Sequence, residues 1–183
     1  MKNLLLIITT ICLISCKAQE AKQPSEEYRY TGERTYQRED SLKISQLLYQ
    51  ASIKGDHREN IKSLVFARSF LDIPYVGYTL EVNDEEKLVI NTRELDCTTF
   101  MENVVALTLC DKAGRYTFDD FCYFLQKIRY GEGDTVAYWN RNHYFFGWMA
   151  ENEKKGIVER ITDEAYHTAK MEADIDFMST HVG

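Results

Sequence analysis

Apolar residues recur at helical spacing over several stretches of this chain. In residues 41–54 and 60–71 they fall three or four positions apart, which predicts two amphipathic helices joined by a polar turn. The same spacing predicts a buried helix over 97–110 and another helix over 117–129, and a short polar helical segment follows at 150–155. Helices are therefore expected to be the main elements of the fold.

The pattern predicts few strands. Residues 78–82 and 87–91 are extended runs on either side of the turn-forming residues 83–85, and together they predict a β-hairpin. Residues 157–161 predict one more strand. The hairpin would deliver the chain to the start of the third helix, on which Cys97, Met101, Val104 and Thr108 are expected to share one face.

The first sixteen residues have the charged, apolar and small-residue regions of an export signal. The apolar run after Lys2 is too short to span a bilayer. The segment ends in Leu13-Ile14-Ser15-Cys16, which resembles a bacterial lipoprotein signal with Cys16 as the lipidated residue. An ordinary cleaved signal or a short anchor helix is the alternative. We expect a lipoprotein signal peptide in 1–16, a polar tether in 17–27 and one folded domain in 28–183. The protein is thus expected in the periplasm, held at the membrane by its lipid.

Charge and composition narrow the choice of partners. The formal net charge of -7 argues against a nucleic-acid partner, because a phosphate-binding surface is normally basic. Aromatic residues make up 13% of the chain, which suits a surface that stacks on sugars or peptides and equally suits an ordinary core. The oligomeric state is left open.

The cysteines indicate a free thiol. Cys12 and Cys16 belong to the signal, which leaves Cys97, Cys110 and Cys122 in the folded domain. An odd number of thiols in an oxidising compartment implies that at least one is unpaired. Cys97 and Cys110 are too far apart on one helix to form a disulfide, whereas a bridge between Cys110 and Cys122 stays possible. No pair of Cys or His has the spacing of a zinc site, so no metal or cofactor is expected.

Cys97 occupies a position that favours reactivity. It follows Asp96, a residue with N-cap chemistry, where an extended run gives way to the third helix. The unpaired N–H groups and the positive end of the helix dipole favour a thiolate there. The alternative is that Cys97 is a small buried apolar residue.

A second candidate cluster lies in residues 135–149. Arg141 and His143 sit among aromatic residues there, and a guanidinium beside aromatic faces is a common way to hold an acidic ligand. The alternative is that His143 is an ordinary core histidine.

The segments 73–81, 95–107, 141–145 with Trp148, and 175–181 resemble, in this order, the N-acetylmuramoyl-L-alanine amidase-like family, formerly domain of unknown function 1460. That family is a branch of the NlpC/P60 cysteine peptidase superfamily. The resemblance implies a papain-like α+β fold and a cell-wall hydrolase that acts on muropeptides, which are peptidoglycan fragments. Such family members usually continue past the fourth segment into a strand-rich half, so we expect the present chain to carry the helical half and few strands of a truncated domain.

The same resemblance implies roles for individual residues. Cys97 would be the nucleophile, attacking an amide carbonyl to form a thioester that water resolves. The catalytic base would be His143, a residue beyond the present terminus, or His181 in the fourth segment. Substrate contacts are expected from Tyr75, Thr98, Arg141 and Trp148. Two alternatives to an amidase stay open: an endopeptidase that cuts between D-Glu and the diamino acid, and a catalytically inactive, lipid-anchored muropeptide-binding protein.

Overall fold

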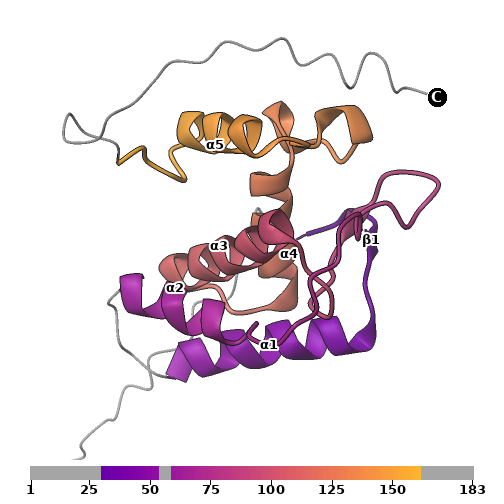
Figure 1. Ribbon diagram of the computed structural model, residues 1–183. Coiled ribbons are helices and arrows are strands. Elements are labelled where there is room, and N and C mark those ends of the chain that lie inside the picture. Colours follow the sequence, from indigo (N-terminus) through magenta and orange to yellow (C-terminus); the bar gives the residue numbers. More distant parts are fainter. Residues whose placement is uncertain (1–29, 54–58, 162–183) are drawn as a thin grey trace, which may run out of the picture.

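The computed structural model describes residues 30–53 and 59–161, and helices dominate this part of the chain (Figure 1). The predicted helices at 41–54, 60–71, 97–110 and 117–129 are confirmed, with small differences at their ends. The elements are α1 (Arg38–Ile53), α2 (Glu59–Arg68), α3 (Cys97–Ala113), α4 (Phe118–Arg129) and α5 (Phe145–Lys154), with the short 3-10 turns η2 (Glu132–Asp134) and η3 (Tyr138–Asn140).

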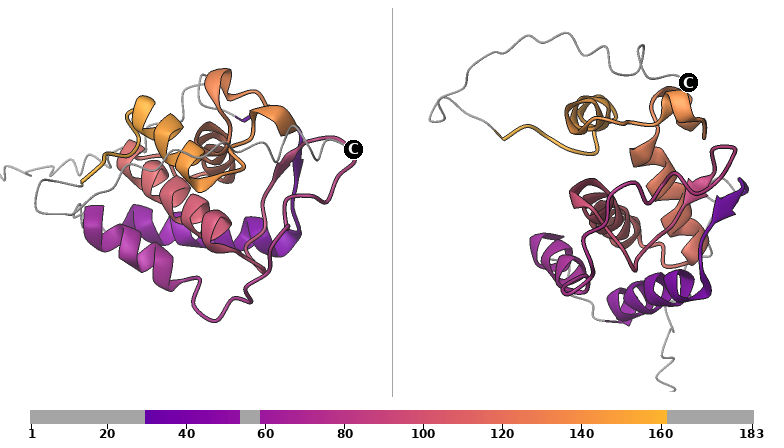
Figure 2. Two further views of the ribbon diagram at one scale, coloured as in Figure 1. Left: turned by 45° about the horizontal axis from the view of Figure 1, so that its top comes forward. Right: turned by 45° about the vertical axis from the view of Figure 1, so that its right-hand side comes forward.

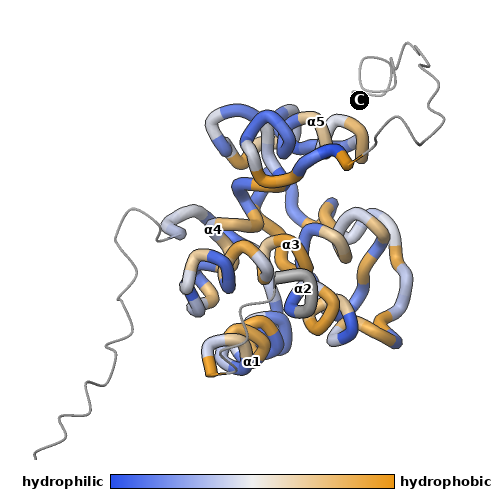
Figure 3. Tube along the Cα trace, turned by 90° about the vertical axis from the view of Figure 1, so that its left-hand side faces the viewer, coloured by the Kyte–Doolittle hydropathy of each residue, from blue (hydrophilic) through white to orange (hydrophobic). Residues whose placement is uncertain are grey.

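Helix α3 lies at the centre of the molecule. Helices α1, α2 and α4 pack around it, while α5 lies on the side of the molecule away from α1 (Figures 2 and 3). The core between these helices is built mainly from buried aliphatic and aromatic side chains: Ile44, Leu48, Phe66, Ala106, Leu107, Phe121, Leu125 and Ile128. The nucleophile candidate is therefore carried by the element that the rest of the fold surrounds.

The buried face of α3 differs from the predicted one. Of the residues predicted to share one face, Met101, Val104 and Thr108 are only partly buried, while Cys97 in the first turn, which was not required to be buried, is exposed. The fully buried row contains polar residues, namely Glu102 and Asn103. Both are tolerated inside the fold because Glu102 pairs with an arginine and the Asn103 amide donates to the Thr99 carbonyl at 2.8 Å. A hydrophobicity pattern cannot find such a face.

The predicted hairpin is wrong. Strand β2 (Leu88–Val89) pairs in parallel with β1 (Arg34–Thr35), in the register Arg34 to Leu88 and Thr35 to Val89, and residues 78–82 form no strand. Tyr78 adopts a left-handed backbone with φ of 62°, which breaks the extended run. The backbone therefore changes direction at Tyr78, and residues 78–82 cannot form the first strand of a hairpin.

The predicted strand at 157–161 is also absent from the described residues. Helix α5 ends at Lys154, and Gly156, with a φ of 68°, then reverses the chain. The backbone N–H groups of Ile157 and Val158 then both donate to the Asn152 carbonyl, at 2.9 and 3.3 Å. These N–H groups close the helix end, which leaves them unavailable to a sheet.

Several predictions concern residues outside the described ranges. The signal, the tether, lipidation at Cys16 and the fourth family segment with His181 all belong to them. In the ranges 30–53 and 59–161, no helix is both long enough and apolar enough to cross a bilayer. Cys97, Cys110 and Cys122 are all free thiols, so the possible bridge between Cys110 and Cys122 is not formed.

Candidate active site

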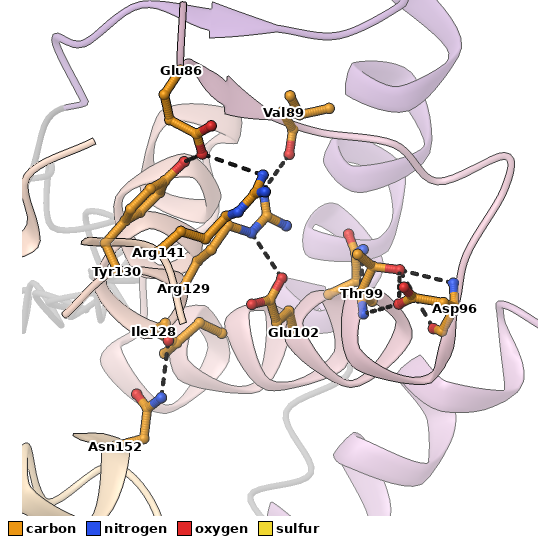
Figure 4. A network of polar contacts seen from close by, with 11 residues as sticks. Glu86, Val89, Asp96, Thr99, Glu102, Ile128, Arg129, Tyr130, Arg141 and Asn152 are labelled. Carbon is orange, nitrogen blue, oxygen red and sulfur yellow. Dashed lines mark hydrogen bonds and ion pairs between the residues drawn. The ribbon is translucent and has the colours of Figure 1, made fainter. Parts of the chain in front are cut away.

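Cys97 is the first residue of α3, as the sequence predicts. The Asp96 carboxylate accepts a hydrogen bond from the Thr99 backbone N–H at 2.7 Å, and the Asp96 N–H donates to the Thr99 hydroxyl at 2.9 Å. This reciprocal pair is a capping box that fixes where the helix begins (Figure 4). The Cys97 side chain is exposed, so its thiol is accessible at the positive end of the helix.

Tyr75 is held next to this thiol by backbone pairing. Tyr75 and Leu95 form a parallel β-bridge, in which the Leu95 N–H donates to the Pro74 carbonyl and the Val76 N–H donates to the Leu95 carbonyl, each at 3.1 Å. The negative charge of a Cys97 thiolate is the largest cause that raises the pKa of Tyr75, with smaller contributions from desolvation, Asp96 and hydrogen bonding to the Cys97 side chain. Tyr75 thus stays a neutral hydroxyl donor beside the sulfur.

A groove of about 800 Å³ opens beside the start of α3. Asp96 and Thr98, on either side of Cys97, line one part of it. Four residues predicted from the sequence as site residues lie in its lining: Tyr75, Thr98, Arg141 and His143. The other lining residues are Gly77, Tyr78, Thr79, Leu80, Glu81, Thr99, Glu102, Arg129, Tyr138, Asn142 and Tyr144. The fold therefore brings the segments 73–81, 95–107 and 141–145 to one concave surface.

His143 is oriented by a backbone carbonyl. Its Nε2 atom lies 2.7 Å from the Tyr138 oxygen, and its ring centroid lies 4.4 Å from that of Tyr138. Because a carbonyl oxygen only accepts, Nε2 must carry the hydrogen, and Nδ1 is left as the basic nitrogen. In the described part of the chain, the Cys97 sulfur contacts the Thr98 hydroxyl at 4.0 Å and Tyr75, and no imidazole hydrogen bond reaches it.

Arg141 forms ion pairs with carboxylates of the protein itself. Its guanidinium is buried and forms ion pairs with Glu81 and with Glu86, the latter at 3.4 Å. It also lies 5.1 Å from the centre of the Tyr138 ring. The predicted ligand-binding cation is therefore neutralised within the protein, and it ties the loop that contains Glu81 and Glu86 to the segment that contains His143.

The floor of the groove contains a buried ion pair that sequence reasoning missed. The Arg129 Nε atom lies 2.8 Å from a Glu102 carboxylate oxygen, and the Arg129 Nη1 atom donates to the Val89 carbonyl at 2.6 Å (Figure 4). Burial raises the pKa of Glu102, while the charge of Arg129 opposes this shift. The only sequence signal was the helical spacing that puts Glu102 on the same face as Thr99 and Ala106.

Trp148 is not brought to the groove. It is 2% exposed, belongs to the hydrophobic core and stacks with Phe145 at a centroid distance of 6.3 Å. A metal site is not indicated in the described ranges either, since no group of three or more His, Cys, Asp and Glu side chains is clustered there.

Comparison with known proteins identifies the class. The described part of the chain is mainly helical with few strands, and the solved structures similar to it include an amidase. The AmiA-like family, described as N-acetylmuramoyl-L-alanine amidase-like, matches residues 65–181, which is more than half of the chain. The chain belongs to this family. A comparison with curated proteins finds no match.

Solved structures agree with this assignment. A Bacteroides fragilis protein that carries the name of a xylanase is 40% identical, with a TM-score of 0.57, and the match covers 64% of this chain and 51% of that one. An N-acetylmuramoyl-L-alanine amidase from Bacteroides uniformis is 38% identical, with a TM-score of 0.50, and the match covers 54% and 41%. A Legionella pneumophila protein, 20% identical over 64% of this chain and 38% of its own, shares the fold with a TM-score of 0.54. The matches thus span about half or less of these relatives.

Proposed function

We propose that this protein is a cell-wall amidase with a cysteine nucleophile, related to the papain-like NlpC/P60 hydrolases. The observation that carries the proposal is the exposed Cys97 at the first position of a capped helix, next to the Tyr75 hydroxyl and at the edge of a groove. Membership of the amidase-like family and the similarity to an amidase from Bacteroides uniformis support a peptidoglycan-derived substrate.

The chemistry follows from the position of the thiol. A Cys97 thiolate attacks the carbonyl carbon of an amide, and the resulting oxyanion is stabilised by backbone N–H groups at the helix start. One such donor is worth about 3 kcal/mol in other acyl-transfer enzymes. The C–N bond breaks, the amine leaves with a proton, and a thioester stays on Cys97. Water then hydrolyses the thioester and restores the thiol.

His143 is our candidate for the base. Its Nε2 hydrogen is engaged by the Tyr138 carbonyl, which leaves Nδ1 to take the thiol proton and to return it to the leaving amine. An imidazole held by a third group is the usual arrangement in cysteine and serine hydrolases. Thr98, at the start of α3 and in the groove lining, is a candidate contact to the substrate.

One observation favours a second candidate function. Among the residues that the structure describes, no imidazole bonds to the Cys97 sulfur, and this is compatible with a protein that binds muropeptides without cleaving them. In either case we propose export as a lipoprotein through Cys16, with the folded domain in the periplasm. Metabolic labelling with palmitate, in the wild type and in Cys16→Ala, tests the lipid anchor, and equal labelling of both would contradict it.

The decisive experiment is incubation of the purified protein with defined muropeptides and chromatography of the products. Release of the intact stem peptide from the sugar identifies an amidase, whereas cleavage after D-Glu identifies an endopeptidase. Cys97→Ala should abolish either product. Xylan is a suitable control substrate, because one solved relative carries the name of a xylanase. Binding of muropeptides without any product would refute the amidase and favour the binding protein.

A further inference from the structure

Two polar side chains in the groove lining have no partner. The Thr79 hydroxyl and the Asn142 amide nitrogen are both buried, and neither forms a hydrogen bond with any residue in the described ranges. Thr79 as a whole is only 8% exposed. A buried polar group without a partner destabilises the folded state, so its presence needs an explanation.

The backbone just before Thr79 adopts an energetically unfavourable conformation. Tyr78 is 89% exposed and takes the left-handed conformation with φ of 62°, which is unfavourable for a bulky residue. This reversal sends the Tyr78 ring outward, while the next residue, Thr79, is buried in the groove wall. Strain of this kind is common where a site must present a particular group to a ligand.

Asn142, in the same lining, is fixed through its backbone. Its backbone N–H donates to the Arg129 carbonyl at 2.9 Å, and the preceding Arg141 is bridged to Tyr130 and paired with Glu81 and Glu86. The backbone N–H of Asn142 is therefore engaged, while its side-chain amide nitrogen is left without a partner in the described ranges. Two rigidly held polar groups thus line one cavity.

We propose that Thr79 and Asn142 bind an amide group of the substrate that is not the one cleaved. The Asn142 amide nitrogen donates to the carbonyl oxygen of this group, and the Thr79 hydroxyl accepts from its N–H. An amide suits this pair because its carbonyl oxygen accepts from the Asn142 amide nitrogen while its N–H donates to the Thr79 hydroxyl oxygen, whereas an apolar group bonds to neither. This inference rests on the proposed function, since it takes a muropeptide as the ligand. In a muropeptide the amide is either the acetamido group of the sugar or a peptide bond of the stem.

Aromatic side chains around these groups fit the same ligand. Tyr75, Tyr78, Tyr138 and Tyr144 line the groove, and each is wholly or partly exposed. Flat aromatic faces pack on the apolar side of a sugar ring or a peptide plane, while a polar pair fixes its orientation. The groove therefore combines stacking surfaces with one specific pair of hydrogen-bonding groups.

The test measures binding separately from catalysis. The full chain carrying Cys97→Ala is titrated calorimetrically with three probes: muramyl dipeptide, N-acetylmuramic acid and L-alanyl-D-isoglutamine. Thr79→Val and Asn142→Leu, added singly, should each weaken the binding of muramyl dipeptide by roughly 3- to 10-fold. Asn142→Asp should do the same and serves if Asn142→Leu does not fold. Thr108→Val on α3 is the matched control, because Thr108 lies outside the groove lining and should leave affinity unchanged.

Thermal unfolding without ligand provides a second readout. Thr79→Val should keep or raise the melting temperature, because it removes an unpaired buried hydroxyl. Thr108→Val should lower the melting temperature, because the Thr108 hydroxyl donates to the Val104 carbonyl at 2.8 Å. A purely structural Thr79 would show the reverse, a lower melting temperature with unchanged affinity, and would overturn the proposal.

The possible outcomes separate this inference from the proposed function. If the variants bind N-acetylmuramic acid more weakly, Thr79 and Asn142 contact the acetamido group. If they bind L-alanyl-D-isoglutamine more weakly, the two residues contact a peptide bond. Affinity equal to that of the parent for all three probes, or no binding by the parent, overturns the inference. A wild-type protein that cleaves muropeptides while its Thr79→Val variant binds them normally overturns the inference alone. Thr79-dependent binding without any product refutes only the amidase.

Discussion

Tyr75 and Leu95 pair in a parallel β-bridge, and this bridge sets the Tyr75 hydroxyl beside the thiol of Cys97. The segment of the chain between these two residues includes β2, yet their backbones pair immediately before helix α3 begins. The effect of the Tyr75 hydroxyl on the reactivity of Cys97 can therefore be tested, because the side chain can be changed while the backbone bridge to Leu95 is kept.

Replacement of Tyr75 by phenylalanine should slow the alkylation of Cys97. The ring and the bridge to Leu95 are kept, but the hydroxyl that can donate to the thiolate is lost. Stability should change by less than about 0.5 kcal/mol, since Tyr75 is 76% exposed. The rate of reaction with iodoacetamide at pH 7 is the measurement, and Tyr78→Phe is the control because that ring lies on the same groove. Equal rates in the wild type and Tyr75→Phe would contradict a role for the hydroxyl.

The thiols of the folded domain should differ sharply in reactivity. Cys97 is exposed, whereas Cys110 and Cys122 are buried. Burial raises the pKa of Cys122 to about 12 and that of Cys110 well above its ordinary value. Alkylation requires the thiolate, so native protein at pH 7.5 should be modified at Cys97 and spared at the two buried thiols. Peptide mass spectrometry measures this, with urea-denatured protein as the control in which all of them react. Native labelling of Cys122 as fast as Cys97 would show that α4 opens readily.

Removal of the cap should destabilise the start of α3. Asp96→Ala loses the carboxylate that accepts from the Thr99 N–H, and we expect the free energy of unfolding to fall by about 1 kcal/mol. Asp96→Asn keeps an acceptor and should stay close to the wild type. Urea unfolding followed by circular dichroism measures both. An Asp96→Asn variant as unstable as Asp96→Ala would point to the charge, and not to the cap, as the stabilising feature.

Loss of Arg141 should unfold the loop that carries Glu81 and Glu86. Arg141→Met removes the partner of both carboxylates, and Glu86 is left in a largely buried position with only the Tyr130 hydroxyl, at 2.8 Å. Breaking a buried pair from one side costs about 3 kcal/mol. Adding Glu86→Gln to Arg141→Met should recover part of this loss, because the uncompensated charge disappears. If Arg141→Met is as stable as the wild type and only weakens ligand binding, Arg141 is a ligand contact after all.

Alkaline pH should weaken the fold through its buried thiols. Burial raises the pKa of Cys122 from about 9 to about 12, so above pH 9 the unfolded chain loses this proton while the folded protein keeps it. The contribution to stability is complete below pH 9 and is lost as pH rises toward 12. Between pH 8 and pH 11 this one thiol should cost about 2.5 kcal/mol.

Cys122→Ala isolates this effect. Its free energy of unfolding should fall less steeply than that of the wild type over the same range, as measured by urea unfolding at each pH. Leu125→Ala on the same helix removes a buried side chain that does not titrate, so its difference from the wild type should be independent of pH. Parallel pH profiles for the wild type and Cys122→Ala would contradict the raised pKa.

The helices and the position of Cys97 could be predicted because local signals specify them. Asp96 and Thr117 are capping residues immediately before helical apolar patterns, and α3 and α4 begin directly after them. The paths of the chain between helices could not be predicted in this way. Residues 78–82 have the composition of a strand, but Tyr78 takes a left-handed backbone and Glu81 pairs with Arg141 from a distant segment.

The same limit applies to the site. Arg141 was expected to bind an acidic ligand, but the carboxylates that match it lie 60 and 55 positions earlier in the chain, and no local pattern connects them. The unpaired groups of Thr79 and Asn142 were also missed, because a sequence does not tell which hydroxyls and amides lack partners. The roles assigned to Cys97, Tyr75, Thr98, Arg141, His143 and Trp148 stay predictions.

The last turn of α4 has a consequence for how this site can vary. Arg129 holds α3 through Glu102, Tyr130 holds the loop at Glu86, and the Arg129 carbonyl holds Asn142. Both walls of the groove and the helix with the thiol are thus anchored at the same two residues, Arg129 and Tyr130. Substitutions on the walls away from Tyr75 can alter ligand preference while leaving the reactive group undisturbed, so the two properties are free to evolve separately. A change at Arg129 or Tyr130 alters both at once, and these positions should tolerate the least diversity in a library selected for any activity.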